Sequence, residues 1–329
     1  MVLENMKEAS RMVQQRTLGA RGLQASAIGL GCMSLSDWTY GSIAESEAIR
    51  LVQHALDRGI TLLDTADIYG PFTCEEIVGK AIKGRREQVV LATKGGLVVT
   101  DPTTRTMRSD GSPAHLKAAC EASLRRLGVE VIDLYQLHRP DPRVPIEASV
   151  GALAELVAEG KVRAIGLSEC DVPTLERASK IHPIATLQSE LSLWTRDPLA
   201  EILPWCQAHG VAFLPFAPLG RGFLTGRYRS ASQFGANDFR SGLPRFQSEV
   251  LAQNLVLVER VEEIARRHNA TPGQVALAWT LAQGEQVIPI PGTKHREYLD
   301  ENLGALEVAL TQADLQELNH LPPAMGTRY

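Results

Sequence analysis

Four side chains that could together move a proton follow three short apolar runs of the sequence. Asp64 and Tyr69 follow the run at residues 60–63, Lys94 follows a run that begins at 89, and His138 follows a run that begins at 131. Each run has the length of a buried strand and stops in polar or glycine-containing sequence, which is typical of a strand that gives way to a loop. An acid, a phenol, an amine and an imidazole are therefore expected at the ends of three successive strands.

These residue types could place a proton donor at a carbonyl oxygen. A phenol is a poor acid near neutrality because its unperturbed pKa is about 10, and a neighbouring ammonium lowers that pKa. We therefore expect Lys94 to make Tyr69 more acidic, Asp64 to keep the lysine charged, and His138 to hydrogen-bond the oxygen of a bound carbonyl. None of these groups carries a hydride, so a reduction would need a cofactor to supply one.

The elements that must position these residues form a regular alternation. Eight apolar runs begin near residues 27, 61, 89, 131, 162, 184, 211 and 286, and a helical pattern follows each of them. Eight β/α units predict an α/β fold, a (β/α)8 TIM barrel, in which the carboxyl ends of the strands carry the active site. Ser42 and Glu45 have the spacing of a capping box at the start of the first barrel helix.

Accessory segments surround the predicted barrel. Residues 18–23 predict a short β-hairpin before the first strand, and further helices are expected between 249 and 280. Residues 1–15 are expected to form a flexible extension, and residues 16–329 a single domain, because no low-complexity linker divides the chain. The segment 95–111 predicts a loop, and 221–247 is long enough without any period to predict a functional loop.

Composition excludes several classes of protein. The 329 residues are 44% hydrophobic and 22% charged, with a net charge of -4 and no long basic block, so no nucleic-acid partner is expected. No apolar run reaches the roughly 18 residues of a membrane span. The cysteines have neither disulfide-framework nor zinc-site spacing, so we expect no metal and a reduced, cytoplasmic protein; they are Cys32, Cys74, Cys120, Cys170 and Cys206.

Taken together, the motifs resemble the aldo-keto reductases. Asp64-x4-Tyr69, Lys94 in Ala-Thr-Lys-Gly and His138 in Leu-Tyr-Gln-Leu-His-Arg-Pro match the family's catalytic tetrad. The likeness runs from about residue 17 to 321 and includes motifs at 166–168, 188–190, 218–220 and 288–293. Segments 192–197 and 239–246 are most similar to the pyridoxal-reductase and auxin-induced-like branch.

The resemblance implies reduction of aldehydes or ketones to alcohols by direct hydride transfer from NADPH, with Tyr69 as the general acid. It places Phe216 against the nicotinamide ring, with Ser168 and Gln188 on its carboxamide, and Lys294 favours NADPH over NADH. Many family members have asparagine where this chain has Glu169, a carboxylate that cannot donate to the carboxamide oxygen. The cofactor-binding residues expected in full are Met33, Asp64, Ser168, Glu169, Gln188, Phe216, Pro218, Leu219, Gly220, Gly222, Leu224, Gly292, Thr293, Lys294, Tyr298, Glu301 and Asn302.

Other interpretations remain beside this one. The chain resembles, as an alternative, the potassium-channel beta subunits of the same family, which implies an NADPH-binding, redox-sensing subunit with slow turnover. An unrelated barrel enzyme with a Schiff base on Lys94 is a further possibility, and His138 disfavours a carbon double-bond reductase.

Gly29, Gly31 and Ser34 lack the third glycine and the following helix of a dinucleotide loop. Each tetrad residue taken alone would be a cap, packing or satisfied polar residue. The sequence leaves the carbonyl substrate and the oligomeric state open.

Overall fold

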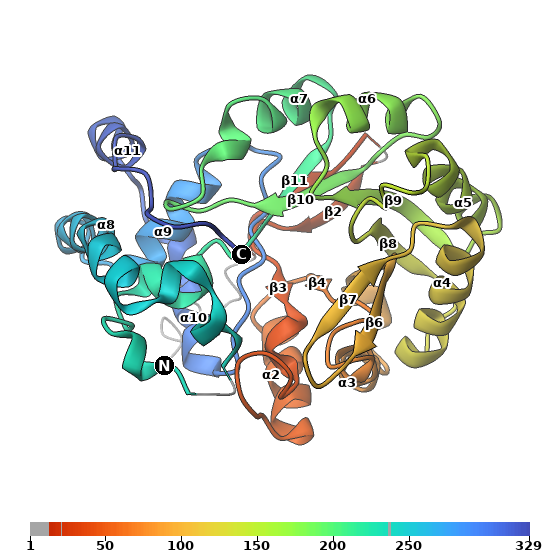
Figure 1. The fold of residues 1–329 in the computed structure, drawn as a ribbon, viewed down its shortest axis with the longest axis horizontal. Helices are drawn as coiled ribbons and strands as arrows, with labels where there is room; N and C mark the ends of the chain where they lie inside the picture. Colours follow the sequence, from red (N-terminus) through yellow and green to blue (C-terminus); the bar gives the residue numbers. More distant parts are fainter. Residues whose placement is uncertain (1–12, 21, 236–237) are drawn as a thin grey trace, which may run out of the picture.

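Seven parallel strands form the wall of a barrel in this computed structural model, which describes residues 13–20, 22–235 and 238–329 (Figure 1). Neighbouring strands follow the order β11-β10-β9-β8-β5-β4-β3. Their bounds are β3 Leu30–Gly31, β4 Leu62–Asp64, β5 Val90–Gly95, β8 Ile132–Leu137, β9 Val162–Ser168, β10 Thr186–Glu190 and β11 Ala212–Phe216. The prediction of an α/β barrel is confirmed.

The eighth position of the wall is filled by residues 286–291, which were expected to be a strand but form no regular ladder. The amide of Ile288 donates to the carbonyl of Phe213 in β11 at 2.9 Å, and the amide of Gly29 donates to the carbonyl of Pro289 at 2.9 Å. Proline has no N–H and cannot donate back to the neighbouring strand. The segment therefore closes the barrel between β11 and β3 while remaining irregular.

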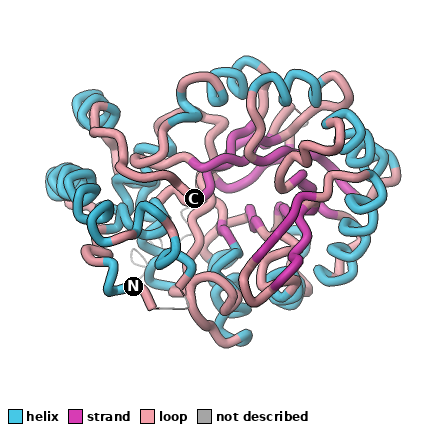
Figure 2. Tube along the Cα trace, viewed as in Figure 1, coloured by secondary structure: helices cyan, strands magenta, loops and turns pink. Residues whose placement is uncertain are grey.

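Helices cover the outside of the wall (Figure 2). Ser112 caps α4 by accepting from the amide of His115, and Thr271 opens α9 with a capping box. The capping box predicted at Ser42 is wrong, because α2 begins at Glu45 directly after Ala44, which has no side-chain acceptor. The bounds are α2 Glu45–Asp57, α3 Thr73–Ile82, α4 Pro113–Leu127, α5 Ile146–Ala158, α6 Val172–Ser179, α7 Ile202–Ala208, α8 Ser248–Arg267, α9 Pro272–Leu281, α10 Arg296–Leu303 and α11 Gln312–Asn319.

The predicted N-terminal hairpin is present and fills the amino-terminal end of the barrel. Its strands are β1 (Gln15–Leu18) and β2 (Leu23–Ser26), and Leu18 is fully buried among inward-facing strand residues. Gln15 was assigned to a flexible extension, but it already belongs to β1; residues 1–12 of that extension lie outside the described residues. With its other end plugged, the barrel offers the carboxyl ends of the strands for a site.

Two insertions build up that carboxyl end. Residues 95–111, expected to be a loop, contain an antiparallel hairpin of β6 (Leu97–Asp101) and β7 (Thr106–Ser109). The described part of segment 221–247 contains short 3-10 helices joined by irregular backbone, in line with its lack of any period. Among the described residues, no helix has the length and hydropathy needed to cross a membrane.

Candidate active site

Asp64, Tyr69, Lys94 and His138 meet at the carboxyl end of the barrel. The parallel register pairs Lys94 of β5 with Gln136 of β8, so the ends of neighbouring strands lie side by side. The ammonium nitrogen of Lys94 lies 2.5 Å from Oδ1 of Asp64 and 3.4 Å from the hydroxyl oxygen of Tyr69. The rings of Tyr69 and His138 are 5.8 Å apart and edge to face. All four residues singled out by spacing therefore form one cluster.

Lys94 and Asp64 form a buried ion pair whose polar groups are all satisfied. Lys94 is 0% exposed and also donates to the carbonyl of Thr65 at 2.9 Å. The second oxygen of Asp64 accepts from the side-chain amides of Gln136 at 3.2 Å and Gln188 at 2.8 Å. Burial favours a lower pKa for Lys94, but the attraction of Asp64 and Tyr69 outweighs it and raises that pKa. The lysine is thus charged at neutral pH.

Tyr69 and His138 are both uncharged in this site. Burial raises the pKa of Tyr69 above its ordinary value, although Lys94 acts to lower it. Lys94 therefore acts in the expected direction, but desolvation of the phenolate is the larger effect, so the pKa of the phenol is not lowered overall. Burial, together with the charges of Arg139 and Lys94, holds the pKa of His138 well below its usual range.

A cavity of about 820 Å³ opens directly over this cluster. Asp64, Tyr69 and His138 line it. So do most of the predicted cofactor residues, namely Met33, Gln188, Phe216, Pro218, Leu219, Gly222, Gly292, Thr293, Lys294, Tyr298, Glu301 and Asn302. The same cavity is thus lined both by Asp64, Tyr69 and His138 and by residues between 292 and 302.

Four of the predicted cofactor residues do not line the cavity. Ser168 accepts a hydrogen bond from Arg139 at 2.9 Å. Leu224 is fully buried in the hydrophobic core, and Gly220 packs against it and the indole of Trp194. The carboxylate of Glu169 accepts hydrogen bonds from the amide of Glu190 and from Arg328. These four residues therefore do not face the cavity in this structure.

Basic side chains gather along the part of the cavity away from Tyr69. Arg227 stacks on the ring of Tyr298 at 3.6 Å and pairs with Glu301 at 2.6 Å. Lys294 donates to the carbonyl of Tyr40 at 2.5 Å, which ties the segment after residue 291 to the loop after β3. Sequence reasoning named Lys294 but missed Arg227, because the aperiodic segment 221–247 gives no indication of which side chains face inward.

Arg221 is a second functional candidate that the sequence did not reveal. It lines the cavity, is 8% exposed and donates to Glu190 at 3.1 Å, while its Nη1 has no hydrogen-bond partner among the described residues. A buried guanidinium nitrogen without an acceptor is costly, so this atom is poised for a polar or anionic group. Its φ of +55° lies in the left-handed region, which is strained for a residue with a side chain.

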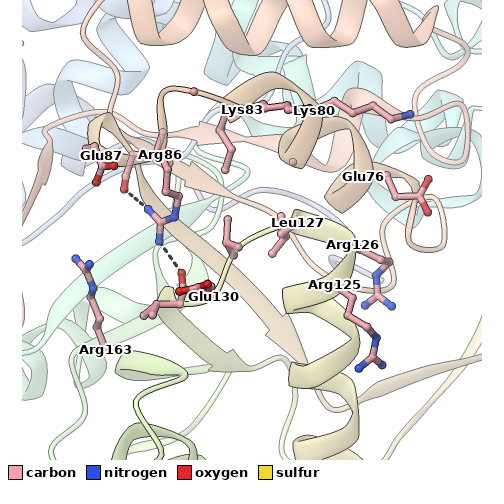
Figure 3. Close-up of a pocket in the computed structure, with 17 residues that line it drawn as sticks. Glu76, Lys80, Lys83, Arg86, Glu87, Arg125, Arg126, Leu127, Glu130 and Arg163 are labelled. Atoms are coloured by element: carbon pink, nitrogen blue, oxygen red, sulfur yellow. Dashed lines mark hydrogen bonds between the residues drawn. The ribbon is translucent and has the colours of Figure 1, made fainter.

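A second hollow lies at the opposite end of the barrel, between the ends of α3 and α4 (Figure 3). Arg86 spans it by donating to the carbonyls of Val89 and Val131 at 2.8 and 2.7 Å, and it also pairs with the buried Asp133. Arg126 likewise pairs with the buried Glu75. Arg86 and Arg126 here compensate buried carboxylates, and Glu76, Glu87 and Glu130 also line the hollow. This hollow is therefore structural.

Comparison with known proteins is consistent with the geometry. The model of the "Aldo/keto reductase family" matches residues 27–322. Probable aldo-keto reductase 1 of Glycine max is 45% identical over 321 residues, covering 96% of this chain and 92% of that protein. The structure of the glycerol dehydrogenase of Gluconobacter oxydans superposes with a TM-score of 0.85 at 32% identity, covering 93% of this chain and 94% of the other. An aldo/keto reductase from Klebsiella pneumoniae, solved with NADP and acetate, superposes with a TM-score of 0.72 at 28% identity, covering 96% and 99%. The chain belongs to the aldo/keto reductase family.

Proposed function

We propose that the chain reduces aldehydes or ketones to alcohols with NADPH, and that Tyr69 delivers the proton. Family membership carries the coarser statement, an NADP(H)-dependent oxidoreductase that acts on carbonyl groups. The observation that carries the finer one is the hydroxyl of Tyr69, 3.4 Å from the ammonium of Lys94 at the edge of the cavity. A phenol in that place is a proton donor with a cation beside it.

The cavity suits a dinucleotide phosphate. Its volume of about 820 Å³ is within the usual range for ligand sites, and Phe216 lines it with an aromatic ring. Within the described part of the chain, one buried nitrogen of Arg221 has no hydrogen-bond partner, and Arg227 and Lys294 also line the cavity with positive charge. These residues would hold NADPH, which supplies the hydride when bound. A related structure from Klebsiella pneumoniae was solved with NADP.

The chain's own residues would handle the carbonyl oxygen and its proton. The neutral imidazole of His138 has one N–H, which can donate to the oxygen and orient it. As the carbon accepts a hydride, the oxygen becomes an alkoxide and takes the proton of Tyr69. Lys94 then stabilises the phenolate, and Asp64 holds the lysine in place. The phenolate regains a proton from water, so one carbonyl, one hydride and one proton give one alcohol.

A direct assay tests this function. Purified protein, shown to be folded and to bind NADPH, should consume the NADPH absorbance band when an aromatic aldehyde is added, and the matching alcohol should form in equal amount. Absence of turnover with a broad panel of aldehydes and ketones would contradict the proposal. Retained NADPH with very slow turnover would instead favour the redox-sensing subunit.

Two finer predictions and one open question accompany the proposal. The branch resemblance predicts pyridoxal among the substrates, which the same panel tests. The cysteines Cys32, Cys74, Cys120, Cys170 and Cys206 are all free and buried, which supports the predicted cytoplasmic location, and fractionation of cells tests it. Sedimentation at several protein concentrations would determine the oligomeric state, which the sequence left open.

A further inference from the structure

Residues 325–329 lead to the chain end, which lies beside the strands of the barrel in Figure 1, and Tyr329 lines the cavity. Met325 exchanges two hydrogen bonds with the side chain of Asn254 in α8, at 2.8 and 3.1 Å. The carbonyl of Gly326 accepts from Arg245 at 3.1 Å. The segment is therefore fixed on the α8 side before it reaches the cavity.

Glu169 holds the other end of this segment. Its φ of +54° is unusual for a residue with a side chain, and Glu169 is not among the residues that line the cavity. One carboxylate oxygen accepts from the amide of Glu190 at 3.1 Å, and the other accepts from Arg328 at 2.9 Å. The side chains of Glu169 and Arg328 are 16% and 31% exposed, so solvent and salt screen the pair only in part.

The ion pair is one part of a balanced network of two carboxylates and two guanidinium groups. Glu190 is fully buried and accepts from Arg221 at 3.1 Å, with Arg328 at 3.8 Å. The guanidinium of Arg221 lies 5.0 Å from the ring centre of Tyr329, which itself lines the cavity. The contacts that hold Arg328 therefore also hold Tyr329 at the cavity wall.

We propose that Glu169 is a positioning residue that, through Arg328, holds Tyr329 as a wall of the cavity and so limits the size of the carbonyl substrate. The proposal rests on the proposed function for its substrate, while the placement of residues 325–329 is independent of it. An asparagine at position 169 would carry no charge for Arg328, so the network would keep one carboxylate against two guanidinium groups. The segment would then lose its anchor beside the cavity.

Neutral variants of the pair test the effect on substrate selection. In Glu169→Gln and Arg328→Gln, the ratio of kcat/KM for a small aldehyde to that for a bulky ketone should fall about fivefold, the equivalent of roughly 1 kcal/mol. The double variant should match the single ones, because both remove the same interaction, and Arg328→Lys should retain most of the ratio. Glu147→Gln, which breaks the exposed pair with Arg177 on the outer helices, is the matched control and should leave the ratio unchanged.

Hydrogen exchange of the 325–329 amides gives a readout that needs no turnover. Exchange should be about tenfold faster in Glu169→Gln than in the parent, while NADPH affinity stays within about twofold. Weaker NADPH binding with unchanged exchange would overturn the proposal, since Glu169 would then be a cofactor contact. Faster exchange with an unchanged substrate ratio would also overturn it, because Tyr329 would not limit the cavity. If the parent protein reduces no carbonyl, the proposed function fails, and the exchange rates still decide whether Glu169 anchors the segment.

Discussion

The hydroxyl of Tyr69 lies 3.4 Å from the ammonium of Lys94, yet its pKa is raised. Desolvation of the phenolate is the larger effect on this pKa, and the charge of Lys94 only reduces the rise. The tyrosine therefore keeps its proton in the resting protein and gives it up when an alkoxide develops beside it. Lys94 contributes by stabilising the phenolate that results.

Replacing Tyr69 with phenylalanine should remove the proton donor and little else. We expect kcat/KM for an aromatic aldehyde to fall by about 10²–10⁴, which is the usual size of general acid catalysis. The dissociation constant for NADPH, measured by titration of intrinsic fluorescence, should change less than about twofold. Turnover within a few-fold of the parent would rule out Tyr69 as the acid.

Breaking the buried ion pair from one side should destabilise the fold. Lys94→Met leaves the carboxylate of Asp64, which is 2% exposed, without its cation, and we expect a loss of roughly 3–5 kcal/mol in the free energy of unfolding. The double change Asp64→Asn with Lys94→Met should recover part of that loss, because no charge stays buried. Urea denaturation of the three proteins gives the comparison. Equal stability of the single and double variants would argue against a coupled pair.

Asp67 should make the protein less stable as pH rises toward 7. Burial, then the charge of Glu75, raises the pKa of Asp67 to about 7. Between an unfolded pKa near 4 and that folded value, the folded state holds the extra proton, so the free energy of unfolding falls with rising pH. The loss is complete above pH 7 and amounts to at most about 4 kcal/mol.

The Asp67→Asn variant provides the control for that dependence. The asparagine cannot ionise, so the free energy of unfolding should differ less between pH 5 and pH 8 in the variant than in the parent. Both proteins are compared at a temperature about 20 °C below the melting temperature. Denaturant titrations at both pH values measure it. The same pH slope in both proteins would mean that another group is responsible.

Lys294 should separate NADPH from NADH. It lines the cavity, and its ammonium now donates to the carbonyls of Tyr40 and Gly41, so it lies where a phosphate could replace those acceptors. Lys294→Met should raise KM for NADPH about tenfold or more, because a charge-assisted contact is lost, and leave KM for NADH nearly unchanged. A parallel rise in both values would indicate damage to the loop after β3 instead of a lost phosphate contact.

The sequence by itself determined the barrel and which residues form the cluster at its carboxyl end. Strand and helix periods are local properties, and parallel β/α units place every strand's carboxyl end on one face. Asp64, Lys94 and His138 therefore had to meet once the strands paired. The capping-box spacing at Ser42 did not locate a helix start in the same way, because α2 begins at Glu45 directly after Ala44.

The tertiary structure decided what depends on contacts between distant residues. The direction in which Glu169 points is set by Arg328, 159 positions away, and the closure of the barrel beside Pro289 is set by strands at the other end of the chain. The pKa of Tyr69 follows from the sum of all the atoms that exclude water from it, which no local pattern contains. Spacing could name the groups of this site, whereas burial and long-range partners determine their charge states and orientation.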